Sequence, residues 1–202
     1  MTGWRFLDSL SSHLTFQDQA KLVPVKSAGV AVIFRKEKEG EQVLLIRRAE
    51  RQGDPWSGQV AFPGGMVSAA DRSFEDTAIR ETFEEVGVDL SKGRAVFLGY
   101  MHEFKARTRE VVVVPSVFRL IADPELRPND EVASCEWAPL KELAADEARS
   151  TYIHNTVGGA KVPFPSLVHR GLVVWGLTER ILSVVLEGRT GDDGVLGNIE
   201  RY

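Results

Sequence analysis

The sequence is short of the residues and runs that would mark several classes of protein. One cysteine and four histidines among 202 residues cannot form an internal disulfide and do not suffice for a structural zinc site. Lys and Arg number 25 against 29 Asp and Glu, so no positive charge excess is available for binding nucleic acid. Residues 1–14 lack the apolar run of a signal peptide, and the apolar stretch at 172–177 is too short to cross a membrane. We therefore expect a cytoplasmic protein without nucleic-acid or membrane partners.

The composition that remains is that of a globular chain. Hydrophobic residues make up 43% and charged residues 27% of the sequence. The chain shows no internal repeat and no linker long enough to divide it. We predict one domain over residues 1–202, with a core at about 28–187, an N-terminal arm and a C-terminal helix.

The pattern of apolar residues predicts a mixture of strands and helices without regular βαβ alternation. This order favours an α/β or α+β fold with a mixed sheet. Residues 1–24 are expected to form a short helix and an extended arm, and residues 152–165 to be irregular around a glycine pair. The expected strands are 29–34 and 42–46, joined as a hairpin, and 95–101, 110–121 and 132–137, and the expected helices are 73–86, 140–148 and 171–186.

The helix expected at 73–86 has clear start and stop signals. Ser73 can cap its first turn, with Asp76 three residues later, and Gly87 follows its last residue. The residues expected on its buried face, at helical spacing, are Ile79, Thr82, Phe83 and Val86.

The same helix carries three glutamates, Glu81, Glu84 and Glu85, which its periodicity places on the arc opposite that face. Like charges at this spacing repel, and only Arg80 supplies a local positive charge. Such a set can be an ordinary solvated face. It also suits a hard divalent cation such as Mg²⁺ or Mn²⁺, which prefers oxygen ligands. The Phe-Pro-Gly-Gly run at 62–65 favours the second interpretation, because its backbone can approach a metal or a phosphate closely.

These residues resemble the signature of the Nudix hydrolases, G-x5-E-x7-R-E-U-x-E-E-x-G-U, in which U is aliphatic. The sequence departs from it in having Asp71 for the first glutamate, one more residue before the arginine, and Thr82 at an aliphatic position. The positions that match are Gly65, Arg80, Glu81, Glu84, Glu85, Gly87 and Val88.

The resemblance extends to the coenzyme A pyrophosphatase branch of that family. The run Leu-Leu-Ile-Arg-Arg-Ala at 44–49, the Gly-Gln-Val-Ala at 58–61 and the Phe-Pro-Gly-Gly at 62–65 are similar to that branch, as is the late apolar segment at 174–182. Ile46 stands where the branch has threonine, and Gly53 where it has arginine. In the late segment Trp175 has helical spacing to Leu172 and Leu182, which predicts a core position.

The resemblance implies an α/β/α sandwich with a central mixed sheet and an enzyme that uses Mg²⁺ or Mn²⁺. It also implies roles for particular residues. The candidate metal ligands are Glu81, Glu84, Glu85 and the Gly65 carbonyl, and the candidate catalytic residues are Glu84, Glu131 and Arg80. The candidate substrate-binding residues are Arg47, Arg48, Ser57, Gly58 and Gly64.

The expected activity is hydrolysis of the diphosphate linkage of a nucleoside diphosphate derivative. The substrate that the resemblance favours is coenzyme A, cleaved to 3′,5′-ADP and 4′-phosphopantetheine. ADP-ribose or a dinucleotide would use the same signature with other recognition residues, and a binding module could keep the fold without turnover. The partner expected is a small nucleotide substrate, and the sequence is compatible with a homodimer.

Overall fold

The computed structural model describes residues 3–16, 26–54, 56–106, 111–156 and 158–187. The extended arm expected before residue 25 lies mostly outside these ranges. Within them, none of the helices combines the length and the apolar character needed to cross a bilayer. The single domain over residues 1–202 stays a prediction.

A mixed sheet forms the centre of the described structure, with the order β3-β2-β1-β7-β5. Strands β1 and β7 run parallel, whereas β1 and β2 form the expected antiparallel hairpin, and three further strands pair at the side of this path. The strands are β1 (Lys26–Glu37), β2 (Gly40–Arg48), β3 (Val60–Ala61), β4 (Gly64–Met66), β5 (Ala95–Tyr100), β6 (Phe104–Ala106), β7 (Val111–Leu120) and β8 (Val132–Pro139).

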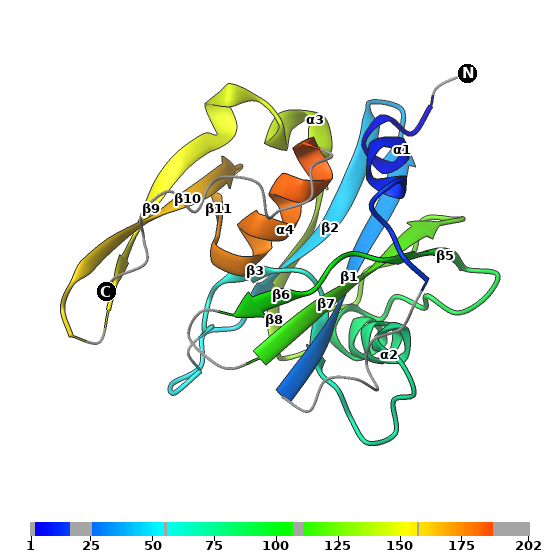
Figure 1. Ribbon diagram of the computed structural model, residues 1–202, viewed down its shortest axis with the longest axis horizontal. Coiled ribbons are helices and arrows are strands. Elements are labelled where there is room, and N and C mark those ends of the chain that lie inside the picture. Colours follow the sequence, from blue (N-terminus) through cyan, green and yellow to red (C-terminus); the bar gives the residue numbers. More distant parts are fainter. Residues whose placement is uncertain (1–2, 17–25, 55, 107–110, 157, 188–202) are drawn as a thin grey trace.

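Helices cover both faces of this sheet, because alternate residues of its strands point to opposite sides. Val32 and Phe34 of β1 belong to a core shared with α1 (Arg5–Ser11) and α4 (Gly176–Glu187). Ala31 and Ile33 belong to a second core, under α2 (Phe74–Val86). Figure 1 shows α2 on one side of β1 and β7, and α4 on the other. The predicted α/β/α arrangement with a mixed sheet is confirmed.

The region expected to be irregular is instead part of a small antiparallel sheet, which we call the ribbon. It comprises β9 (Arg149–Asn155), β10 (Lys161–His169) and β11 (Leu172–Trp175) in the order β11-β10-β9. Pro163 and Pro165 do not prevent this, because β10 pairs with β9 alone at these positions and a missing N–H leaves no bond unmade on the open side.

Two expected helices are shorter than predicted. The segment at 171–186 begins as strand β11 and becomes helical at Gly176, whose φ of 68° suits glycine at this sharp change of direction. The segment at 140–148 divides into α3 (Leu140–Leu143) and a 3-10 turn at Asp146–Ala148.

A buried histidine ties the ribbon to the rest of the molecule. Nε2 of His169 lies 3.1 Å from Oε1 of Glu136 on β8, and Nδ1 lies 3.3 Å from Oε2 of Glu142 on α3. Arg170 adds a contact of 3.2 Å to the second carboxylate. The ribbon is thus held by polar contacts as well as by Leu167 and Val174, which enter the apolar core.

Helix α2 begins and ends as predicted. Oγ of Ser73 accepts a hydrogen bond of 2.9 Å from the Asp76 N–H, and Gly87 closes the helix in the left-handed conformation. Its buried face differs from the prediction, because Phe83 is 59% exposed and Glu85 is 3% exposed. The helix is therefore rotated so that one of its glutamates, rather than its phenylalanine, points inward.

We predict that Ser73→Ala lowers the free energy of unfolding by about 1 kcal/mol, because the Asp76 N–H loses its acceptor. Urea denaturation followed by circular dichroism measures this change. Ser150→Ala, an exposed serine on β9, is the control and should change stability by less. Equal effects of the two substitutions would contradict a capping role for Ser73.

Candidate active site

The site forms where β4 lies against α2. The Gly64 N–H donates a hydrogen bond of 2.9 Å to Oε2 of Glu85. Gly65 lies so close to Glu81 that a Cβ at this position would be 2.5 Å from its carboxylate. A glycine at 65 is therefore required for the loop and Glu81 to meet, and two carboxylates one helical turn apart face the same stretch of backbone.

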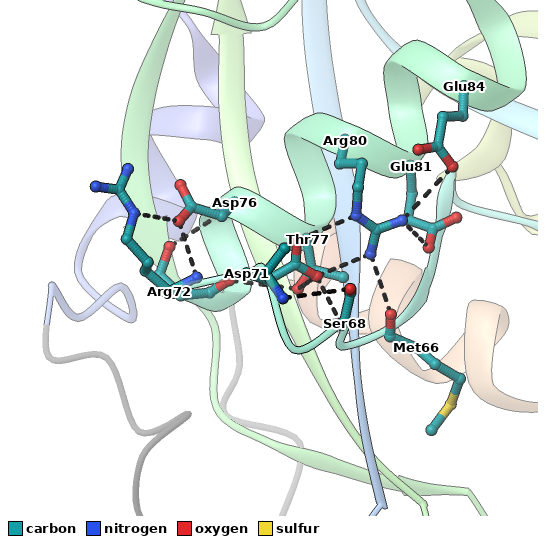
Figure 2. A network of polar contacts seen from close by, with 11 residues as sticks. Met66, Ser68, Asp71, Arg72, Asp76, Thr77, Arg80, Glu81 and Glu84 are labelled. Atoms are coloured by element: carbon teal, nitrogen blue, oxygen red, sulfur yellow. Dashed lines mark hydrogen bonds and ion pairs between the residues drawn. The ribbon is translucent and has the colours of Figure 1, made fainter.

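Arg80 is held by a carboxylate from the loop before α2. Its Nε and Nη2 donate to the two oxygens of Asp71, at 3.0 and 2.8 Å, and its Nη1 lies 2.6 Å from Glu81 (Figure 2). Nη2 also donates to the Met66 carbonyl. The departure at Asp71 thus keeps a bidentate partner for the arginine, and Arg80 in turn orients Glu81.

Glu84 is more exposed than Glu81 and Glu85. The side chain of Glu84 is 54% exposed and lies 3.5 Å from Nη1 of Arg80, its predicted countercharge. Figure 2 shows Glu81 and Glu84 on the same side of Arg80. In the described part of the chain, no three Asp, Glu, His or Cys side chains already converge as metal ligands do.

The carboxyl of Glu85 has a strongly shifted pKa. Burial is the main cause that raises this pKa to about 7, and the negative charges of Glu81 and Glu131 act in the same direction. The Gly64 N–H and the Arg48 guanidinium act in the opposite direction. Glu85 is thus a buried acid among like charges, an environment that a cation would relieve.

Glu131, in the loop before β8, lies close enough to Glu85 for its charge to act on that carboxyl. Its carbonyl accepts a hydrogen bond of 2.8 Å from Ala49, and its carboxylate lies 3.1 Å from Nη1 of Arg51. The Asn129 N–H donates to the Glu85 carbonyl at 2.9 Å, so this loop is fixed to the end of α2. The structure therefore brings Glu131 near Glu85, although 46 positions separate them.

Arg48, a predicted substrate ligand, lies beside this acidic group. It forms an ion pair of 2.9 Å with Asp54, and its Nη1 is 4.0 Å from Oε1 of Glu85. Its Nε is buried and has no hydrogen-bond partner among the described residues. This unsatisfied donor next to the glutamates is consistent with a role in binding an anion.

The other predicted substrate residues line a groove on the opposite side of β2. Arg47, Ser57 and Gly58 share it with Tyr152 and Trp175 of the ribbon. The predicted core position of Trp175 is wrong, because this residue ends a strand and its ring is only partly buried. Sequence reasoning also missed Tyr152; a signal was available in the Tyr-Ile-His alternation before the Gly-Gly turn, which is typical of a hairpin strand.

The residues present fit a hard divalent cation. Glu81, Glu85 and the loop backbone offer oxygen donors with a net negative charge, and Glu84 lies on the same helix at 3.5 Å from the arginine that also contacts Glu81. The raised pKa of Glu85, caused first by burial and further by the charges of Glu81 and Glu131, is the second sign of a cation site. The ligand roles of these residues and of Gly65 stay predictions.

The comparisons with known proteins agree with this arrangement. Residues 25–155 match the NUDIX domain, so the chain belongs to the Nudix family. It is 34% identical over 153 residues to the peroxisomal coenzyme A diphosphatase ndx-8 of Caenorhabditis elegans, covering 72% of this chain and 63% of that protein. It is 32% identical over 164 residues to the mitochondrial coenzyme A diphosphatase NUDT8 of Homo sapiens, covering 80% and 68%.

Two further comparisons concern length and fold. An uncharacterised protein of Schizosaccharomyces pombe is 38% identical over 132 residues, and the match spans only 40% of that protein, so this chain covers less than two thirds of some relatives. A MutT/nudix family protein from Enterococcus faecalis aligns with a TM-score of 0.54 at 23% identity, over 90% of this chain and 68% of that one. This likeness shows the shared fold.

We predict that Asp71→Asn destabilises the protein by about 2 kcal/mol at pH 7. The hydrogen bonds from Arg80 lower the pKa of Asp71 from 3.8 to about 2, and each unit corresponds to about 1.4 kcal/mol. Because the folded pKa lies below the unfolded one, this stabilisation is present above pH 3.8 and is lost as the pH falls toward 2.

Urea denaturation of both proteins between pH 7 and pH 3 tests this prediction. The difference between wild type and Asp71→Asn should shrink at the acidic end. Asp146→Asn, which removes a carboxylate that is 98% exposed, serves as the control and should have little effect at either pH. A difference independent of pH would show that the charge of Asp71 is not what matters.

For Glu85→Gln we predict loss of cation binding without loss of stability. Glutamine can still accept the hydrogen bond from Gly64, whereas the buried charge and its repulsion by Glu81 disappear. Melting temperatures measured with and without Mn²⁺ should rise with the metal in wild type and hardly change in the variant. The metal-free variant should melt at the same temperature or higher, and Glu147→Gln should behave as wild type. A strongly destabilised variant that still binds Mn²⁺ would make Glu85 structural.

Proposed function

We propose that this Nudix protein hydrolyses the diphosphate linkage of coenzyme A to 3′,5′-ADP and 4′-phosphopantetheine. The observation that carries the proposal is the placement of Arg48, with an unsatisfied buried donor, beside Glu85 in a chain that keeps the three helical glutamates Glu81, Glu84 and Glu85 of the signature. The two relatives named as coenzyme A diphosphatases support this substrate over other diphosphates.

In this proposal Glu81, Glu84, Glu85 and the Gly65 carbonyl hold Mg²⁺ or Mn²⁺. When bound, the cation makes water more acidic and neutralises charge that develops on the phosphates. Arg80, fixed by Asp71, keeps Glu81 in position and does not contact the substrate.

The chain's own groups then move the proton and hold the substrate. Glu131 or Glu84 accepts a proton from the attacking water, and both have side chains about half exposed at the site, 50% and 54%. Arg48 binds the diphosphate with Gly64 as a neighbouring substrate contact, and Arg47, Ser57 and Gly58 bind the substrate further out.

The proposal also places the enzyme in the cytoplasm, as its single cysteine predicts, although the two named diphosphatases are peroxisomal and mitochondrial. A homodimer stays a prediction. ADP-ribose and dinucleotides are the rival substrates. A non-catalytic binding module is less well supported, because Glu81, Glu84 and Glu85 are all present.

We predict that the purified protein is inactive after treatment with EDTA and recovers with Mg²⁺ or Mn²⁺. Chromatography of the products should then show 3′,5′-ADP and 4′-phosphopantetheine from coenzyme A. ADP-ribose, NADH and dinucleotides assayed in parallel should be turned over more slowly. Full activity in chelator would contradict the metal site, preference for ADP-ribose would reassign the substrate, and binding without turnover would favour the module.

A further inference from the structure

A groove lies beside the ribbon, and none of the signature glutamates lines it. It measures about 160 Å³ and lies between the loop before β3 and strands β9 and β11. One wall is apolar, with Leu172, Val173 and the ring of Trp175, and the other is polar, with Arg47 and Ser57. A ligand that fills it must combine an apolar surface with hydrogen-bonding or charged groups.

Arg47 supplies the charge of this groove. It is exposed, and among the described residues no carboxylate or other group pairs with it. Arg47 and Arg48 are the last two residues of β2, so their side chains leave opposite faces of the sheet. Arg48 faces Glu85, and Arg47 therefore belongs to the groove rather than to the glutamates.

The apolar wall is built from stacked rings. Trp175 and Tyr152 have ring centroids 4.3 Å apart at an interplanar angle of 24°, and Trp175 and His154 lie 5.1 Å apart at 30°. Phe164 closes the cluster 5.5 Å from Trp175. Rings that already stack on one another lose little freedom when a further flat group binds against them.

An unpaired guanidinium next to fixed aromatic rings is the chemistry that recognises a phosphorylated nucleoside. Arginine binds phosphate through paired N–H groups, and a base packs on an aromatic surface. An uncharged, flexible arm such as pantetheine would leave Arg47 without a partner. The groove therefore suits the nucleotide end of coenzyme A better than its arm.

We infer that this groove binds the adenosine 3′-phosphate end of the substrate, with Arg47 on the 3′-phosphate and Tyr152 and Trp175 along the base. The inference rests on the proposed function for the identity of the nucleotide. It makes Arg47 and Trp175 determinants of specificity that act away from the glutamates, on the part of the substrate that does not react.

The proposal can be tested without metal and without turnover. Isothermal titration calorimetry in EDTA compares the binding of 3′,5′-ADP and of 5′-AMP, which lacks the 3′-phosphate. Wild type should bind 3′,5′-ADP more tightly. Arg47→Ala should weaken 3′,5′-ADP by about tenfold or more and leave 5′-AMP nearly unchanged, since one charge-assisted contact is lost.

Two further variants test the aromatic wall, and one controls for charge. Trp175→Leu should weaken both nucleotides, and Trp175→Phe, which keeps a ring, should retain most of the binding. Arg149→Ala removes an arginine from the other face of β9, where its ion pairs with described residues are exposed ones to Asp146 and Glu187, and should bind both nucleotides as wild type does.

The outcomes separate this inference from the proposed function. If 3′,5′-ADP and 5′-AMP bind equally, or if Arg47→Ala leaves the preference intact, the groove does not read the 3′-phosphate, whether or not coenzyme A is hydrolysed. If 4′-phosphopantetheine binds instead and depends on Trp175, the groove holds the arm and the inference is overturned. If coenzyme A is not hydrolysed while the Arg47-dependent preference remains, the groove's ligand is supported and the proposed reaction is wrong.

Discussion

The close approach of the Gly64–Gly65 backbone to helix α2 is the constraint on which the site depends. Gly64 donates a hydrogen bond to the buried carboxylate of Glu85. Gly65 leaves room for the carboxylate of Glu81, which any side chain at position 65 would displace. Glu85 would otherwise be a charge buried at a considerable cost in free energy. The N–H of Gly64, at the start of β4, offsets part of this cost because it donates a hydrogen bond to the buried acid.

Arg80 connects further segments of the chain to this site. Its guanidinium contacts Asp71, Glu81, Glu84 and the Met66 carbonyl, so the loop before α2, strand β4 and the helix share one cation. The side chain of Asp71 is only 4% exposed, which keeps water from competing for this pair. A shorter acid, with one additional residue between it and the arginine, thus anchors Arg80 from the position where the signature has its first glutamate.

Sequence signals at neighbouring positions predicted the elements that are stabilised by contacts between neighbouring residues. Ser73 and Gly87 defined α2 because caps act within one turn of the helix. The orientation of that helix was not predictable in the same way. Periodicity treats a glutamate as polar and Phe83 as apolar, whereas a hydrogen bond from a strand 21 positions earlier buries Glu85. The glutamates themselves were found from the signature, because their spacing is local.

The ribbon shows the other limit of sequence reasoning. A Gly-Gly pair indicated an irregular segment at 152–165, yet the segment forms strands, and Pro163 and Pro165 lie where β10 has only one neighbouring strand, a circumstance set by the register of β11. With the ribbon missed, Trp175 was assigned to a helix and Tyr152 to no site at all. The consecutive hairpins β9-β10 and β10-β11 bring the two rings together, and the groove that they line also contains Arg47, more than 100 positions earlier in the chain.

Two consecutive arginines that leave opposite faces of β2 also bear on how such a protein can diverge. The residues around Arg48 and the glutamates are tied together by mutual contacts, so a change at one of them disturbs the others. Tyr152 and Trp175 line the groove from the ribbon, apart from these contacts. A change in the ribbon would therefore alter the groove and leave the contacts among Arg48, Asp54 and Glu85 as they are.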